Sequence, residues 1–151
     1  MLCRGGEALP LSDDHKPAQE RELRRIEAAG GFVTAQGRVN GNLNLSRALG
    51  DLKYKGNTAV ARAEQMITAE PDVRTVTLEA ADEFLVLACD GVWDVMSSQQ
   101  CVDFVRERIA KGAALEEIVR EIFDECIADD PKTTGGLGGD NMTAIIVRLK
   151  K

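Results

Sequence analysis

The stretch that decides the fold is Glu83–Gln100, which reads EFLVLACDGVWDVMSSQQ. Its first part is an uninterrupted apolar run, which is typical of a strand that is buried on both faces. The run ends abruptly on Asp90 and Gly91, and a second aspartate, Asp94, follows one helical turn later. A carboxylate at the end of a buried strand is costly unless a cation or hydrogen-bond donors meet it. The stretch therefore predicts a buried strand and raises the question of what meets Asp90.

The segments on either side of this strand mix further short strands with helices. The expected elements are two short strands around Gly5 and Gly6, a helix from Pro17 to the glycines at 30–31, a helix that begins at Ser97 or Ser98 and ends at 111–112, a helix over 115–126 and a strand over 142–149. Ser97 and Gln100 have the spacing of a capping box. The segment 115–126 carries apolar residues at helical spacing. This order of elements indicates a layered α+β fold.

Composition narrows the class of protein. A chain of 151 residues fits one domain and can bury a real core. Its charge is uneven, because the first 63 residues carry a small positive excess and the rest a clear negative one. An acidic second half argues against a nucleic-acid partner, since phosphate binding needs concentrated positive charge. It is compatible with bound divalent cations.

Targeting and redox signals are few. No apolar run reaches the roughly 20 residues that a membrane span needs, so we expect no membrane partner. The N-terminal residues lack the pattern of a signal peptide. The four cysteines include no CxxC pair, which indicates neither a zinc site nor a disulfide framework. We expect reduced thiols and a cytoplasmic or nuclear location.

Aspartates at the ends of two predicted strands form the main candidate site. Asp140 follows a glycine-rich tract and immediately precedes the last expected strand, whereas Asp90 follows the central one. If these two strands are neighbours, both carboxylates meet at one edge of the sheet. Gly91 and Gly139 let backbone or solvent approach closely. Carboxylates without histidine or cysteine favour Mg²⁺ or Mn²⁺, and a pair of such ions can direct an attack on phosphorus.

Simpler interpretations remain open for each of these residues. An aspartate before glycine often only forms a turn. His15, the sole histidine, is expected to be a loop residue rather than a catalytic base. Arg38 and Arg47 either face solvent or meet an anion. Cys89 is expected to be a small buried apolar side chain, and Trp93 to anchor the Asp90 turn on the core.

Five segments together resemble the metal-dependent Ser/Thr protein phosphatases of the 2C type. They read SDDHKP (12–17), RVNGNLNLSRALGD (38–51), AEPDV (69–73), LACDGVWDV (87–95) and GGDNMT (138–143), in the family's order. The resemblance covers most of the chain, from Leu2 to Leu149. It implies a four-layer α-β-β-α sandwich in which helices flank two antiparallel sheets, which agrees with the α+β pattern.

The resemblance also implies roles for individual residues. Asp90 and Asp140 match ligands of the family's central pair of Mg²⁺ or Mn²⁺ ions, and Asp14 and Asp94 match ligands of a third ion in some members. The implied reaction is hydrolysis of phosphoserine and phosphothreonine on proteins by a metal-bound hydroxide, with phosphorylated proteins as partners. Residues 51–65 resemble the variable flap beside the family's catalytic cleft.

The chain departs from the family pattern in its first part. It contains no Asp-Gly-His segment, so the family's general-acid histidine and phosphate-binding arginine have no counterpart and no catalytic residue is assigned. Residues 1–151 are therefore expected to be the C-terminal portion of one incomplete phosphatase domain, without its N-terminal strands. The family's N-terminal half is a candidate partner. We expect the isolated chain to be marginally stable and nearly inactive; the alternative is a catalytically inactive fragment that acts as a binding or regulatory module.

Overall fold

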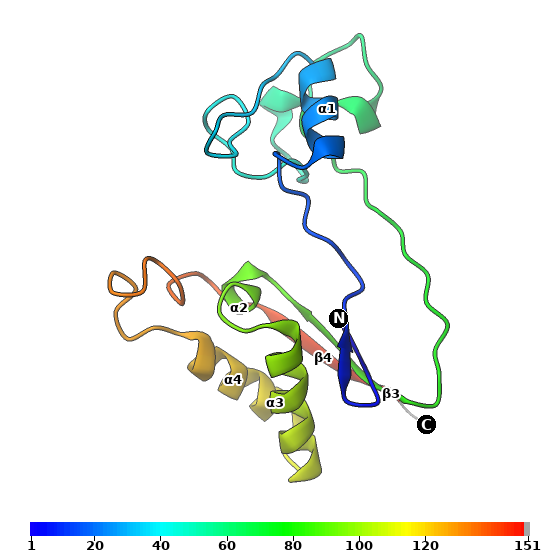
Figure 1. Ribbon diagram of the computed structural model, residues 1–151, viewed down its shortest axis with the longest axis vertical. Helices are drawn as coiled ribbons and strands as arrows, with labels where there is room; N and C mark the ends of the chain where they lie inside the picture. The colour runs from blue at the N-terminus through cyan, green and yellow to red at the C-terminus, as the bar shows by residue number, and fades with distance from the viewer. Residues whose placement is uncertain (150–151) are drawn as a thin grey trace. The chain divides into compact units, whose positions relative to one another are not determined.

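The fold is described for residues 1–149 by a computed structural model, in which the chain divides into two units (Figure 1). The first comprises Met1–Ser12 and Thr75–Lys151, and the second Asp13–Arg74. The expectation of a single incomplete domain stays a prediction. None of the described helices is long and apolar enough to cross a membrane.

A four-stranded antiparallel sheet is the centre of the first unit, with strand order β2-β1-β3-β4. Its strands are β1 (Leu2–Arg4), β2 (Glu7–Leu9), β3 (Asp82–Ala88) and β4 (Ala144–Arg148). The first two form the predicted hairpin around Gly5 and Gly6. Both glycines have positive φ, a conformation that other residues adopt only at a cost.

Two helices follow the central strand and pack beside each other (Figure 1). They are α3 (Ser98–Ala110) and α4 (Leu115–Cys126). The predicted capping box at the start of α3 is confirmed: the Ser97 hydroxyl accepts the backbone N–H of Gln100, and the Gln100 side chain accepts the backbone N–H of Ser97. The predicted stripe of α4 is also confirmed, because Ile118, Ile122 and Cys126 are buried.

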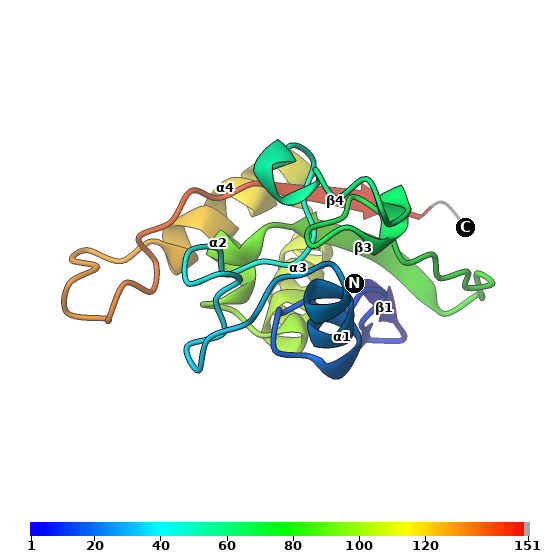
Figure 2. The same cartoon turned by 90° about the horizontal axis from the view of Figure 1, so that it is seen from above.

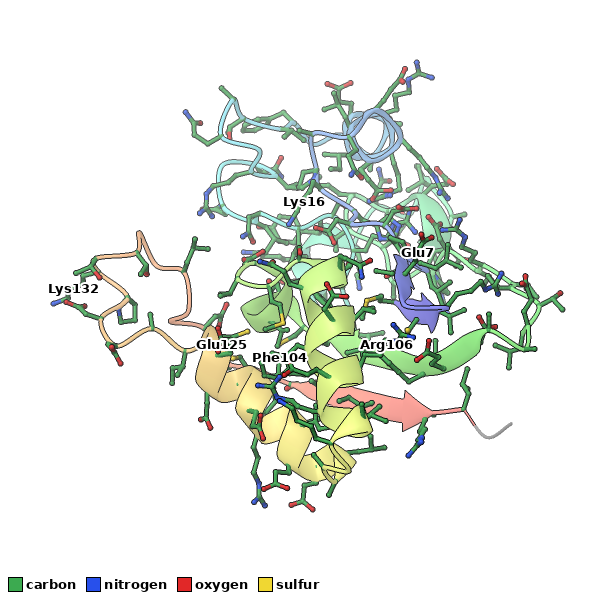
Figure 3. The ribbon with its side chains drawn as sticks, turned by 60° about the horizontal axis from the view of Figure 1, so that its bottom comes forward. Glu7, Lys16, Phe104, Arg106, Glu125 and Lys132 are labelled. Atoms are coloured by element: carbon green, nitrogen blue, oxygen red, sulfur yellow. The ribbon has the colours of Figure 1, made fainter. Side chains whose placement is uncertain are left out.

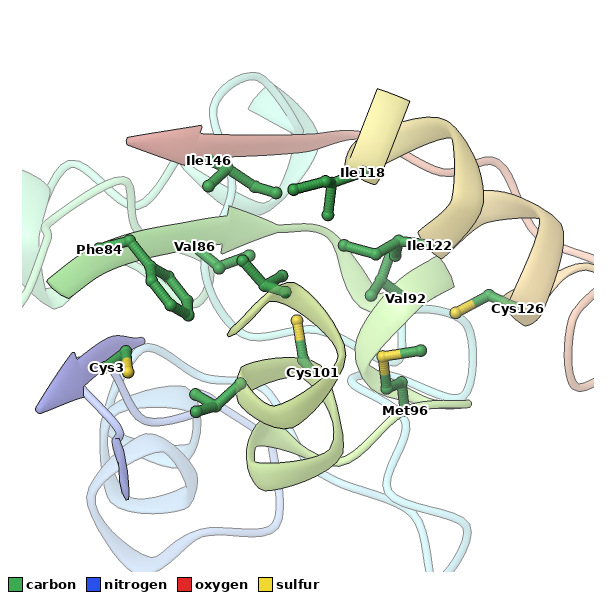
Figure 4. Packing of buried hydrophobic residues seen from close by; sticks show 12 residues of the cluster. Cys3, Phe84, Val86, Val92, Met96, Cys101, Ile118, Ile122, Cys126 and Ile146 are labelled. Carbon is green, nitrogen blue, oxygen red and sulfur yellow. The ribbon is translucent and has the colours of Figure 1, made fainter. Parts of the chain in front are cut away.

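The core of the first unit lies between these helices and one face of the sheet, as Figure 4 shows. Phe84 and Val86 of β3 and Ile146 of β4 point toward the helices. The buried members of the cluster are Cys3, Phe84, Val86, Val92, Met96, Cys101, Val102, Val105, Ile118, Ile122, Cys126 and Ile146. The α+β class with an antiparallel sheet and packed helices is confirmed.

Side chains on the other face of the sheet are partly exposed. Leu87 is 53% exposed, Ile145 56% and Val147 41%. The prediction that the central strand is buried on both faces is therefore wrong for this structure, where burial alternates along β3. The physical reason is that the side chains of α3 and α4 pack against one side of the sheet only.

The second unit has little regular structure, as the loops between α1 and β3 in Figure 2 show. It contains one helix, α1 (Glu20–Ala28), and two short 3-10 turns, η1 (Leu52–Tyr54) and η2 (Arg62–Glu64). The helix begins three residues later than predicted from Pro17. Its small apolar core consists of Ile26, Val39, Tyr54 and Ile67. The long irregular segment expected after Gly31 is confirmed.

Candidate functional site

The ends of β3 and β4 bring Asp90 and Asp140 to the same end of the sheet. The two strands pair antiparallel up to Ala88 opposite Ala144, and the Cys89 N–H extends the ladder by donating to the Thr143 carbonyl at 3.1 Å. The two strands are therefore neighbours, which is the condition under which both carboxylates were expected to meet at one edge of the sheet. Asp90 and Asp140 lie just beyond this last hydrogen bond, and both are exposed.

Close packing joins the two segments that carry these aspartates. The Cys89 Sγ donates to the Asn141 carbonyl at 3.3 Å and accepts the Thr143 N–H at 3.2 Å. Gly91 is buried, and a Cβ at this position would overlap the Asn141 carbonyl oxygen. The turn therefore requires glycine here. The prediction for Cys89 is wrong, because its thiol is half-buried and hydrogen-bonded rather than a buried apolar group.

A short helical turn, α2 (Asp90–Trp93), sets the spacing of the two aspartates at 90 and 94. The Asp94 N–H donates to the Asp90 carbonyl at 2.8 Å, so Asp94 lies one turn further on, as its spacing predicted. The Trp93 indole donates to the Ala88 carbonyl at 2.8 Å, and its ring packs against the core. The predicted role of Trp93 as an anchor of this turn is confirmed.

The surroundings of the carboxylates explain why the strand can end on Asp90. Its side chain is exposed, so its charge is not taken out of water and no burial cost arises. Asp140 accepts its neighbour's backbone N–H, from Asn141, at 2.7 Å. In the part of the chain that the structure describes, no protein donor or cation meets the side chains of Asp90 and Asp94.

The carboxylate oxygens of these aspartates suit a hard divalent cation. The aspartates are too few to supply all the ligands that such an ion needs. Exposed carboxylate oxygens are the ligands that Mg²⁺ and Mn²⁺ prefer, and such ions also keep several waters. Within residues 1–149, no three or more His, Cys, Asp or Glu side chains gather closely enough to hold a metal ion. Asp14 lies on an exposed loop of the second unit, where Lys16 pairs with it at 3.3 Å. The metal roles of all four aspartates stay predictions.

A buried ion network organises the second unit, and the sequence did not lead us to predict it. Glu22 is only 1% exposed. It accepts from the guanidinium groups of Arg25 and Arg47, each at 2.6 Å, and from the Ser46 hydroxyl at 2.7 Å. Burial alone would raise the pKa of Glu22, but hydrogen bonds from Arg47, Ser46 and Arg25 lower it to about 2.

The network continues to Asp72 and His15. Arg47 donates to the Glu70 carbonyl at 2.9 Å and to the Asp72 carboxylate at 3.0 Å. The His15 ring lies 3.0 Å from the same carboxylate, and these partners hold the pKa of Asp72 well below its usual range. Arg47 is therefore neither a solvated surface residue nor free to hold an anion. Arg38 stays at the surface and donates to the Asn42 carbonyl at 2.7 Å.

A cavity of about 600 Å³ lies beside this network. It is lined by Glu20, Arg21, Arg24, Arg25, Ala28, Arg47, Ala63, Glu64, Thr68 and Glu70. Each of its arginines is already paired with a carboxylate. None of the predicted metal ligands lines it, so the cavity and the aspartate site are separate features.

Comparisons with known proteins agree with the resemblance. Residues 1–135 match the model of the family described as Protein phosphatase 2C. The chain is 51% identical over 151 residues to "Probable protein phosphatase 2C 58" of Oryza sativa subsp. japonica, covering 100% of this chain and 40% of that protein. It is 50% identical over 157 residues to "Protein phosphatase 1G" of Rattus norvegicus, covering 99% of this chain and 29% of that one.

A solved structure is similar over nearly the whole chain. It is that of a phosphatase from a pathogenic strain of Toxoplasma gondii, with a TM-score of 0.80 and 34% identity over 99% of this chain and 46% of that one. The chain thus spans less than half the length of these relatives. Since the family model matches most of its residues, the chain belongs to the protein phosphatase 2C family.

Proposed function

We propose that the protein to which this chain belongs removes phosphate from phosphoserine and phosphothreonine side chains of proteins with the help of Mg²⁺ or Mn²⁺. The observation that carries the proposal is the position of Asp90 and Asp140 at one end of the paired strands β3 and β4, in a chain of the protein phosphatase 2C family. Bound divalent cations would supply charge for the phosphate and an activated water.

Each residue of the site has a distinct task in this proposal. Asp90 and Asp140 would hold the central ions, and the hydrogen bond from the Asn141 N–H orients the second carboxylate. Gly91 lets the two segments approach closely. Asp94 and Asp14 would hold an accessory ion, and residues 51–65 would contribute to the choice of protein substrate.

A phosphate-release assay with a phosphothreonine peptide tests the proposal. We expect little Mn²⁺-dependent turnover from the isolated chain, because Asp90 and Asp140 alone leave the ions few fixed charges. In a domain completed with the N-terminal half of a relative, Asp90→Ala should abolish turnover and weaken Mn²⁺ binding, measured by calorimetry. Glu117→Ala, at an exposed position in the first turn of α4, should change neither. A completed Asp90→Ala domain that keeps its turnover contradicts the assignment.

A binding or regulatory module is the second candidate. One observation favours it: residues 1–149 gather no group of three metal-binding side chains. If it is correct, adding the chain to an active relative should slow dephosphorylation of a protein substrate but not of a small phosphate ester. Equal rates with and without the chain would rule out this form of regulation.

A further inference from the structure

The thiol of Cys89 occupies a place in the sheet that a backbone carbonyl normally fills. The register of β3 and β4, continued by one residue, puts Cys89 opposite Thr143, and the Cys89 N–H donates to the Thr143 carbonyl at 3.1 Å. In such a hydrogen-bonded antiparallel pair, the Thr143 N–H would in return donate to the Cys89 carbonyl. It donates instead to the Cys89 Sγ, at 3.2 Å. The side chain therefore replaces the backbone as the acceptor.

The Cys89 carbonyl is used in the turn that carries Asp90. It accepts the Val92 N–H at 3.1 Å and the Trp93 N–H at 3.3 Å. A carbonyl that begins a helical turn lies along the helix axis, so it is no longer directed across the sheet toward β4. The thiol lets the chain leave the strand for α2 while the pairing with the segment after Asp140 continues.

The same thiol also holds the residue next to Asp140. Its S–H donates to the Asn141 carbonyl at 3.3 Å, and this carbonyl oxygen packs against Gly91, where a Cβ would lie 2.3 Å from it. The Asn141 N–H in turn donates to the Asp140 carboxylate at 2.7 Å. Cys89 is therefore linked to the Asp140 side chain through one intervening residue.

The segment before Asp140 is a long loop. Residues 127–139 lead from the end of α4 to this aspartate, and Figure 3 shows Lys132 where the loop projects away from the sheet. Loops are more mobile than the elements that they connect. The position of Asp140 relative to β3 therefore depends on the hydrogen bonds of residues 141–143, which the Cys89 thiol holds.

We propose that Cys89 is a positioning residue of the metal site, whose thiol sets the separation of Asp90 and Asp140. This role rests on the proposed function, in which the two carboxylates hold Mg²⁺ or Mn²⁺. Mg²⁺ accepts only a narrow range of ligand distances, so a shift of the Asp140 segment should weaken binding. Groups that orient a metal ligand through hydrogen bonds typically contribute about 10-fold to 100-fold to metal affinity. Cys89 itself would touch neither ion nor substrate.

Cys89→Ala and Cys89→Ser, which differ by one hydroxyl group, test this inference. In the domain completed with the N-terminal half of a relative, Cys89→Ala should raise the dissociation constant for Mn²⁺, measured by calorimetry, by at least about tenfold. Cys89→Ser should recover most of the affinity, because a hydroxyl also donates and accepts. Ser97→Ala, which removes a capping hydrogen bond of α3, costs stability but should leave the dissociation constant unchanged.

Hydrogen exchange in the 151-residue chain reports on the geometry without metal. In Cys89→Ala the amide of Thr143 should exchange faster, because it loses its acceptor. The amides of Ile145 and Val147, which pair with β3, should keep their rates. Faster exchange along the whole of β4 would mean that Cys89 only stabilises the sheet, and would overturn the proposal.

The binding data separate this inference from the proposed function. If Asp90→Ala lost Mn²⁺ affinity but Cys89→Ala kept it, the positioning role would be wrong and the proposed function would stand. Cys89→Ser as weak as Cys89→Ala would also contradict the positioning role, because the hydrogen bonds would then not be the cause. If Asp90→Ala itself kept the affinity, the proposed function and the positioning role would both be wrong.

Discussion

Different interactions stabilise the interior of each of the two units of this chain. The first unit packs two helices on a sheet around a continuous apolar cluster that includes Phe84 and Ile122. The second has one helix and long loops, and its apolar core is small. Its most buried charged group is Glu22, which binds Arg25 of the same helix and the adjacent residues Ser46 and Arg47. Hydrophobic packing therefore dominates one unit, and a buried ion network organises the other.

This difference determines how each unit should respond to change. Apolar packing tolerates changes of pH but loses stability when volume is removed. Removing one partner of a buried ion pair, or its charge, is strongly destabilising because the other charge then stays buried without compensation. Core truncation should therefore act on the first unit, and charge removal on the second. Native-state hydrogen exchange reports on each unit separately.

The largest effect is expected for Phe84→Ala in the first unit. Phe84 is almost fully buried between β3 and the helices, so its truncation should cost about 3–5 kcal/mol of unfolding free energy. Hydrogen exchange should accelerate at the amides of β3, α3 and α4 while those of Gly31–Thr68 change little. Leu87→Ala, on the exposed face of the same strand, should cost far less. If the amides of both units exchanged equally faster in Phe84→Ala, the two units would not be stabilised independently of each other.

A slightly smaller effect is expected for Glu22→Ala in the second unit. Removing this carboxylate leaves Arg25 and Arg47 buried with less counter-charge, at a cost of roughly 3 kcal/mol. Asp72 and backbone carbonyls still meet part of that charge, which keeps the cost at the low end for a buried pair. Exchange should accelerate around Ser46 and Arg47. Glu27→Ala, on the exposed side of the same helix, should leave these rates unchanged.

Acid should weaken the second unit through the same carboxylate. Because the pKa of Glu22 in the folded chain is about 2 and in the unfolded chain about 4.3, its contribution is fully present above the higher value. It is lost progressively as the pH falls toward the lower one. Hydrogen exchange of Ser46 and Arg47, corrected for intrinsic rates, should accelerate across this range. Glu22→Gln should flatten that dependence, and an unchanged profile would contradict the network's role.

Much of the first unit could be predicted because its signals are local and periodic. The apolar run of β3, the stripe of α4 and the Ser97–Gln100 box each occupy consecutive or regularly spaced positions. The Glu22 network could not be predicted in the same way, since Ser46 and Arg47 lie far along the chain from α1. One signal was present: Glu22, Arg25 and Ile26 share a helical face, so the polar pair follows the buried isoleucine into the interior.

The candidate site was predictable for a related reason, and only in part. Strand pairing converts two separate sequence positions, Asp90 and Asp140, into neighbours at one end of the sheet, and glycine at 91 is required by the close approach of Asn141. The exposure of Leu87 was not predictable from the run that contains it. An apolar strand sequence indicates a possible second packing layer but does not state whether the same chain supplies it.

The smallest effect is expected for Ser97→Ala, which tests whether local signals contribute to the first unit beyond its core. The Ser97 hydroxyl accepts the Gln100 N–H at 3.3 Å, and the reciprocal bond from the Ser97 N–H to the Gln100 side chain is 2.9 Å. Replacing the hydroxyl leaves one helix N–H without its partner and should cost about 1 kcal/mol. Ser98→Ala, one residue into α3, removes no capping hydrogen bond and should cost less. Equal losses at the two positions, measured by urea unfolding followed at Trp93, would mean that the box adds nothing to the stability that the apolar cluster already provides.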